Sequence, residues 1–338
     1  MNAAPTRDSR SRRSVLLTVV ASLLGLALLV WQVGRVGLDE VARGFAAVGS
    51  GFLVVLVLSL GRFALRAVAW RALIPDRVPL RSALGASLAG DALGNLTPLS
   101  VLVGEPAKAM YLSRDVSRSR AFATLTAENF FYSVSVAIYV VLGTAAMLIA
   151  FPVPAGLREA GVISLVMMAG VLAVAAWMAW QRPSLASAVL ARVPVARLRA
   201  VVDRVRAFEV DTYGSAGGGG GRLTVVLAAE TTFHVLSFLE VWLVLWWLVG
   251  ESLPLQAFVL DTFSRIVNVV FKIVPLRLGV DESVSSAVAD AIALTSAVGV
   301  TLALVRKGRM LVWAVVGLLL MARRGLTSPA DPRSPSTS

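Results

Sequence analysis

The residues of this chain that could do chemistry gather in two interrupted stretches between hydrophobic segments. The first stretch, DALGNLTPLSVLVGEPAK, runs from Asp91 to Lys108 and also carries Asn95, Pro98 and Glu105. A helix that faces lipid excludes such a run, because proline removes a backbone hydrogen bond and each charge in hydrocarbon costs kilocalories. Irregular, charged backbone persists at membrane depth only where protein surrounds it or where it lines a wet cavity. The stretch is either a polar loop outside the membrane or a buried polar site, and we favour the site because a second copy follows.

The second stretch covers residues 255–282 and has the same order of residue types. Its polar and proline positions are Asp261, Arg265, Asn268, Lys272, Pro275, Arg277, Asp281 and Glu282. In both stretches Asn is followed by Pro, then Gly, then Glu at the mouth of the next apolar segment. Seven positions separate proline from glutamate in each, from Pro98 to Glu105 and from Pro275 to Glu282. The agreement predicts two related elements, one in each half of the chain.

Composition places the chain among helical integral membrane proteins. It has 338 residues, 57% of them hydrophobic, and a mean hydropathy of +0.79. Several apolar runs approach or exceed the 18 residues that indicate a transmembrane helix. The net charge of +12 is read first as a topology signal, and no basic soluble region with interleaved aromatic residues indicates nucleic-acid binding. The absence of cysteine and the single His234 argue against thiolate chemistry and multi-histidine metal sites, so we expect no metal and no cofactor.

The predicted fold is an all-α integral membrane protein with about seven or eight transmembrane helices. We expect spans at residues 14–33, 51–70, 121–150, 161–180, 222–249, 283–305 and 310–321, with a short outer turn at 151–160. Residues 14–322 form the membrane domain, whose halves, 51–150 and 223–305, are joined by the cytoplasmic segment 181–222. Residues 195–208 have the spacing of an amphipathic helix on an anionic lipid surface. The basic N-terminus, 1–13, and the tail, 323–338, are expected to be disordered, with the N-terminus cytoplasmic.

The apolar segment before the first interruption is too short to cross a membrane. Ser82–Leu96 gives about 22 Å of helix, against a hydrocarbon core of roughly 30 Å. A re-entrant hairpin from the cytoplasmic side is the economical interpretation. If the second stretch re-enters from the outside, the basic run 306–309, read as a loop, returns to the cytoplasm. The two hairpins then form an inverted repeat, which in many transporters places the binding site near the midplane.

Other charged residues lie inside the expected spans. Arg62 and Arg66 are one turn apart, and they either extend to the inner surface or face a lipid headgroup. Glu230 and His234 are also one turn apart on one helix. A proton relay is conceivable for this pair, but we favour a hydrogen bond between helices.

The motifs resemble those of the transmembrane, flippase-like family of lysylphosphatidylglycerol synthases. The matching positions are Asn95, Pro98, Gly104, Glu105 and Lys108 in the first signature, Glu128 after it, and Pro275, Gly279, Glu282 and Arg306 in the second. The resemblance covers most of residues 14–322 and implies a lipid-translocating membrane domain. No soluble transferase domain follows the last span, so the aminoacylation in the family name is not expected.

The leading hypothesis is a transporter, not an enzyme, that moves a lipid with a polar or anionic headgroup between leaflets of the inner membrane. The expected translocation residues are Arg62, Arg66, Asp91, Asn95, Pro98, Glu105, Lys108, Glu128, Arg265, Lys272, Pro275, Gly279 and Glu282. The alternative is a membrane-embedded transferase that acts on a lipid-linked substrate, with Asp281 and Glu282, or Asp91 and Glu105, as its acids. A non-transporting scaffold would leave the buried charges unexplained. Which lipid is moved, in which direction and in what oligomeric state does not follow from the sequence.

Overall fold

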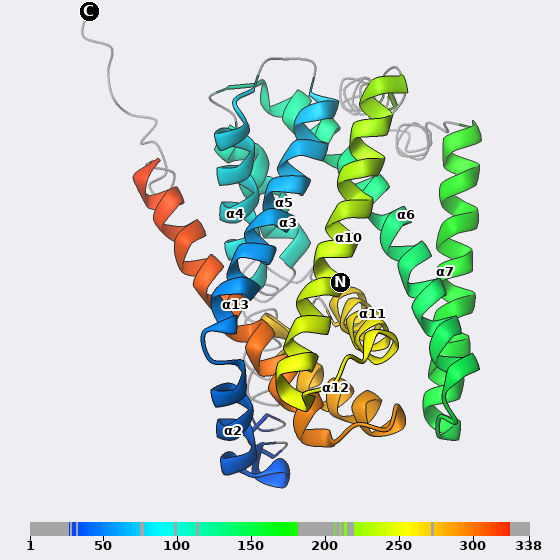
Figure 1. The fold of residues 1–338 in the computed structure, drawn as a ribbon. Coiled ribbons are helices and arrows are strands. Elements are labelled where there is room, and N and C mark those ends of the chain that lie inside the picture. The colour runs from blue at the N-terminus through cyan, green and yellow to red at the C-terminus, as the bar shows by residue number, and fades with distance from the viewer. Residues whose placement is uncertain are drawn as a thin grey trace, which may run out of the picture.

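The computed structural model describes residues 27–74, 78–97, 100–112, 115–181, 206, 210, 213–214, 220–271 and 274–324, apart from positions 28 and 32. Their regular elements are all helical, as the sequence predicts (Figure 1). The helices are α2 (Leu38–Val48), α3 (Gly51–Leu73), α4 (Leu80–Leu96), α5 (Ser100–Leu112), α6 (Arg118–Ala150), α7 (Ala155–Gln181), α10 (Gly220–Val249), α11 (Pro254–Val270), η2 (Pro275–Arg277), α12 (Val280–Ala291) and α13 (Ser296–Arg323). Most of the expected first span, most of the amphipathic segment 195–208 and the tail beyond 324 lie outside the described residues.

Four of these helices, α3, α6, α7 and α10, are long and apolar enough to cross a membrane. Each has 23 to 33 residues, and about 20 residues are needed for the roughly 30 Å core. They coincide with the predicted spans at 51–70, 121–150, 161–180 and 222–249. The chain is therefore a multi-pass membrane protein. One boundary differs: α7 begins at Ala155, so only residues 151–154, with Pro152 and Pro154, form the turn predicted for 151–160.

Two pairs of short helices occupy opposite ends of the bundle. In Figure 1, α4 and α5 lie in the upper half of the view and α11 and α12 in the lower half. The α4 and α5 backbones approach closely, because a Cβ on Gly104 would lie 2.8 Å from the Gly90 carbonyl oxygen. In the second pair, α12 begins after Gly279, whose φ of 76° suits glycine. Both interrupted stretches are thus breaks between two helices.

The last part of the chain differs from the prediction. Residues 283–305 are not one span, because α12 ends at Ala291 and α13 begins at Ser296, after a turn in which Ala293 has a φ of 63°. The Thr295 hydroxyl caps α13 by accepting a hydrogen bond from the Val298 amide at 3.4 Å. The expected basic loop at 306–309 is also wrong, because α13 continues through it to Arg323 and contains the predicted span 310–321. Arg306 and Lys307 are buried among other helices. Their partners are the Leu260 carbonyl and the Glu282 carboxylate rather than water.

Close helix contacts at glycine residues relate the two halves of the chain. α3 and α10 are antiparallel: Gly51 lies against Trp247, and Gly61 lies against Leu236. Gly143 of α6 packs on Thr262 of α11, and Gly317 of α13 packs on Leu88 of α4. Leu88 and Thr262 are each the ninth residue of a 17-residue helix. The separation is 174 positions both from 88 to 262 and from 143 to 317, so the α3–α6 and α10–α13 segments use equivalent contacts.

We predict that Gly317→Ala destabilises the protein, because the new Cβ would collide with the main-chain oxygen of Leu88, which cannot rotate away. The expected loss is about 1–3 kcal/mol, typical of overpacking. Gly170→Ala on α7 is the matched control, since nothing lies within 4 Å of a Cβ there. Thermal unfolding in detergent measures both variants. Equal midpoints for the two would contradict the close α13–α4 contact.

Candidate functional site

A small polar cavity of about 110 Å³ lies among α3, α6, α10, α11 and α13. We call it the arginine chamber. Its lining residues are Arg62, Tyr132, Val136, Ser237, Glu240, Asp261, Ser264, Arg265, Asn268, Val269, Arg306 and Arg309. Four guanidinium groups therefore face two carboxylates. Arginine stays charged in proteins, so the lining carries two formal positive charges in excess.

The two carboxylates of the arginine chamber are each shared between several donors. Glu240 accepts hydrogen bonds from Arg62, at 3.0 Å, and from Arg309. Asp261 accepts from Arg265, at 2.9 and 3.2 Å, and from the Ser237 hydroxyl at 3.0 Å. Both carboxylates are almost completely buried, and their four partners come from α3, α10, α11 and α13. Ion pairs in the chamber thus join α10 to α3 and α13, and the Ser237–Asp261 hydrogen bond joins α10 to α11.

Two donors of the arginine chamber have no acceptor among the described residues. They are the Arg62 Nε atom and one terminal nitrogen of Arg306. The other Arg306 nitrogen only reaches the Leu260 carbonyl at 3.4 Å. Guanidinium groups bind phosphate and carboxylate in a planar, two-point geometry. The unused donors and the surplus charge fit a small anionic group.

Aromatic rings hold the arginines in position. The Arg62 guanidinium lies 4.8 Å from the Phe233 ring centroid, and that of Arg265 lies 4.3 Å from Tyr139. Such cation–π contacts stabilise the charge by about 0.5–2 kcal/mol and restrict its orientation. The chamber is therefore preorganised rather than filled with loose side chains.

The first half carries its own polar network, which joins α3, α5 and α6. Arg66 forms a two-point ion pair with Glu128 at 2.8 and 2.7 Å and donates to Asn129 Oδ1 at 3.1 Å. The Asn129 amide nitrogen donates to Glu105 Oε2 at 2.9 Å, and the Lys108 ammonium donates to Glu105 Oε1 at 2.9 Å. Arg66 thus points to a carboxylate inside the bundle, and it does not extend to the membrane surface. These contacts unite four of the predicted site residues.

In the second half the signature glutamate pairs with α13. The Lys307 ammonium lies 3.2 Å from Glu282 and 3.7 Å from Asp281, and it donates to the Leu276 carbonyl at 3.0 Å. Glu282 is completely buried. The acid pair considered for a transferase is therefore occupied by an internal cation. No cluster of three metal-binding side chains occurs in the part of the chain that the structure describes.

The remaining predicted residues have separate positions. Asn95 donates to Asp91 at 2.8 Å within α4, and Gly279 is the N-cap of α12. Pro275 begins η2. Pro98 and Lys272 lie outside the described residues. Of the eleven predicted positions that the structure describes, Arg62 and Arg265 line the arginine chamber.

Four charged chamber residues are absent from the predicted site: Glu240, Asp261, Arg306 and Arg309. Glu240 was visible as a charge within an apolar span, but its partners lie on other helices. Arg306 and Arg309 were read as part of a loop, although their three-residue spacing places them on one face of a helix. That spacing is the signal that could have identified them.

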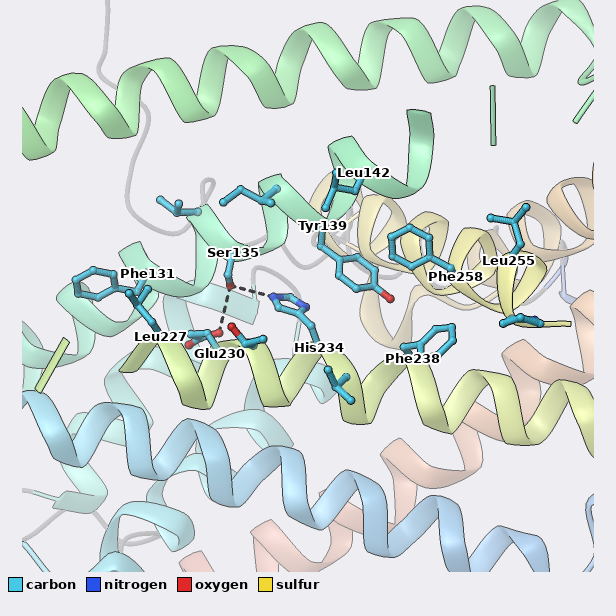
Figure 2. Close-up of a pocket in the computed structure, with 15 residues that line it drawn as sticks. Phe131, Ser135, Tyr139, Leu142, Leu227, Glu230, His234, Phe238, Leu255 and Phe258 are labelled. Atoms are coloured by element: carbon cyan, nitrogen blue, oxygen red, sulfur yellow. Dashed lines mark hydrogen bonds between the residues drawn. The ribbon is translucent and has the colours of Figure 1, made fainter. Parts of the chain in front are cut away.

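A second, larger cavity opens beside the chamber. It has a volume of about 720 Å³ and lies between α6, α10 and the start of α11 (Figure 2). We call it the lateral groove. Its lining residues are Phe131, Val134, Ser135, Ile138, Tyr139, Leu142, Leu227, Glu230, Thr231, His234, Val235, Phe238, Pro254, Leu255 and Phe258. The lining is mainly aliphatic and aromatic.

Three polar residues in the lateral groove connect α6 to α10. The Ser135 hydroxyl donates to Glu230 at 3.2 Å, and His234 Nε2 lies 3.0 Å from the same hydroxyl (Figure 2). These are the hydrogen bonds between helices that the sequence favoured for Glu230 and His234. They set the spacing of the two helices along the groove.

Comparison with known proteins gives one match. The family model described as Lysylphosphatidylglycerol synthase TM region matches residues 16–319, which is most of the chain. No curated protein and no solved structure is similar enough to count as a match.

We predict that Glu128→Gln destabilises the protein by about 3 kcal/mol, because Arg66 would stay buried without its carboxylate. The double change Arg66→Met with Glu128→Met should recover most of that loss, since it removes both charges. Glu40→Gln is the control: its pair with Arg43 is exposed and contributes less than about 1 kcal/mol. Thermal unfolding of the four proteins gives the comparison. A Glu128→Gln loss no larger than that of Glu40→Gln would contradict the network.

Proposed function

The chain belongs to the lysylphosphatidylglycerol synthase TM region family, and we propose that it moves a lipid with a polar or anionic headgroup between the leaflets of the inner membrane. The observation that carries this proposal is the arginine chamber, where four guanidinium groups line a cavity that holds only two carboxylates, and Arg306 pairs with neither of them. Charges inside a membrane bundle are expensive and mark a substrate or ion pathway. A family of lipid-related membrane proteins makes a lipid the substrate that fits.

The size and charge of the chamber support a headgroup site. Binding pockets for whole ligands typically measure 300–1,000 Å³, and the chamber measures about 110 Å³. A phosphate group, rather than a whole lipid, suits this volume. The unused donors of Arg62 and Arg306 would donate hydrogen bonds to its oxygens. Each such bond to a charged group contributes about 1.5–3 kcal/mol of binding free energy.

We further propose that the α4–α5 and α11–α12 pairs are re-entrant hairpins of an inverted repeat. The 17 residues of α4 and of α11 each give about 25 Å of helix, short of the roughly 30 Å core. The opposed placement of the two pairs and the antiparallel course of α3 and α10 support this topology. In such repeats, rocking of one half against the other exposes a midplane site to each side in turn. The chamber is lined by α3 and α6 of the first half and by α10, α11 and α13 of the second, which supports a site shared by the two halves.

The continuous helix α13 indicates how the chain is oriented in the membrane. Because α13 is continuous, its end lies beside the start of α4: Arg324 donates to Ser82 at 3.2 Å and to the Tyr111 carbonyl at 2.9 Å. The basic ends at Arg71, Arg81 and Arg324 then share one side, which we assign to the cytoplasm. The N-terminus and segment 181–222 are assigned to the same side by their charge.

We predict that Arg306→Met slows lipid movement at least tenfold, because a charge-assisted hydrogen bond to phosphate contributes about 1.5–3 kcal/mol. Purified protein in liposomes with fluorescent phosphatidylglycerol, followed by bleaching of the outer leaflet, measures the rate. Arg306→Lys should show an intermediate rate, since it keeps the charge and loses the two-point geometry. Arg43→Met, at an exposed ion pair on α2, is the control and should be unaffected.

Two outcomes would overturn this assignment. Wild-type protein that fails to move any of a panel of anionic, zwitterionic and neutral lipids would contradict transport. Chemical conversion of the lipid headgroup in the same vesicles would favour the membrane-embedded transferase instead.

We predict that each hairpin begins and ends on one side of the membrane, and that the two hairpins use opposite sides. The chain has no cysteine, so single cysteines report position without background. Arg81→Cys and Ser119→Cys flank α4–α5 and should react with a membrane-impermeant maleimide from the cytoplasmic side. Ser252→Cys and Ala293→Cys flank α11–α12 and should react from the other side. All four positions are exposed, and labelling of both pairs from one side would contradict the inverted repeat.

A further inference from the structure

The lateral groove has the properties of a site for a hydrocarbon chain. Several of its lining side chains are half-exposed on helices that span the membrane: Ile138 is 47% exposed, Leu142 58%, Leu227 51% and Val235 48%. Its volume of about 720 Å³ falls within the range of real binding sites. At this depth the surroundings are lipid chains rather than water. The structure therefore offers a pocket that opens to the bilayer and is lined mainly by hydrocarbon.

The three helices that line the lateral groove, α6, α10 and α11, also line part of the arginine chamber. On α10, His234 and Phe238 line the groove, whereas Ser237 and Glu240 line the chamber. On α6 the groove positions include Ser135 and Tyr139, and the chamber positions are Tyr132 and Val136. On α11 the groove ends at Phe258 and the chamber begins at Asp261, one helical turn later. The two cavities are thus neighbours at one level of the bundle.

A single aromatic side chain stands at the boundary between the two cavities. The Tyr139 ring stacks on His234 at 4.9 Å and meets Phe258 edge-on at 4.8 Å (Figure 2). Its other neighbour is the Arg265 guanidinium, 4.3 Å from the ring centroid. Tyr139 therefore contacts the apolar lining and a chamber cation at once. A molecule that places an anionic group by Arg265 and a chain past Tyr139 would match both environments.

We propose that the lateral groove binds an acyl chain of the same lipid whose anionic headgroup occupies the arginine chamber. This inference rests on the function proposed above and adds the position of the chain. The lipid lies across the gap between α6 and α10, with its chain in the groove and its head in the chamber. The Ser135 bridge to Glu230 and His234 keeps α6 and α10 at the spacing that one chain requires.

Photochemical cross-linking tests the position of the chain independently of transport. The probe is phosphatidylglycerol with a diazirine near the end of one acyl chain, incorporated into liposomes with the full-length protein. After irradiation, mass spectrometry of peptides locates the adducts. We expect adducts concentrated on α6, α10 and the start of α11. An even spread over the exposed faces of α3 and α7, which are equally apolar, would overturn the proposal.

Variants that fill the lateral groove provide the second measurement. Ile138→Trp and Leu142→Trp introduce a large ring at half-exposed groove positions, where folding should tolerate it. Val57→Trp on α3 and Val166→Trp on α7 are the matched controls, since both are 68% exposed and neither lines the groove. We expect the groove variants to lower adduct yield and lipid movement at least fivefold, and the controls to leave both within twofold of wild type.

The outcomes separate this inference from the proposed function. Wild-type transport with unaltered rates in both groove variants would overturn the chain site and leave transport intact. Groove adducts without any lipid movement would support the chain site and overturn the transport proposal. Cross-linked dimers of the chain through the groove, in place of lipid adducts, would identify a second copy as the occupant and overturn the inference.

Discussion

The pairing of two buried carboxylates with three of the four arginines around them is the constraint on which the rest of this structure depends. Removing such charges from water costs several kilocalories per ion, and only close partners and complete hydrogen bonding offset that cost. Glu240 pairs with donors from α3 and α13, and Asp261 accepts from Ser237 of α10, so separating these helices would break part of the pairing of a buried carboxylate. The pairing remains incomplete, because cations outnumber acids, and this imbalance makes the chamber receptive to an anion.

Close backbone contact explains how a membrane bundle can support such a costly interior. Apolar side chains gain little from packing together when lipid already surrounds them, so helix association depends on close packing and polar contacts. Gly143 and Gly317 bring α6 onto α11 and α13 onto α4 at equivalent positions of the two halves. The same two helices also deliver charge: Glu128 of α6 pairs with Arg66, and α13 carries Lys307 to Glu282. The helices that pack most closely, α6 and α13, therefore also place the charged side chains next to their partners.

The sequence alone could predict the features that depend on local composition. The four apolar spans, the two interrupted stretches and the isolated charge of Glu128 follow from hydropathy and spacing. The course of α13 does not follow from composition, because a charged triplet such as 306–309 has the composition of a loop. It is helical here because Glu240 and Glu282, distant in sequence, supply partners at membrane depth. Contacts between distant segments, rather than local preference, decided both that element and the residues of the chamber.

A single helix separates the two environments that an amphiphilic substrate needs. On α10, residues at positions 234 and 238 face hydrocarbon, and those at 237 and 240 face the charged chamber. A soluble anion would bind in the chamber but would make no contact with the apolar groove beside it. A hydrocarbon alone would fill the groove but would not pair with the arginines. The Tyr139 ring, stacked on His234, contacts the apolar groove and the Arg265 guanidinium, so the surroundings change from apolar to polar across this one side chain. A lipid changes character just as abruptly between its chain and its phosphate, and this match is the physical basis for assigning both cavities to one molecule.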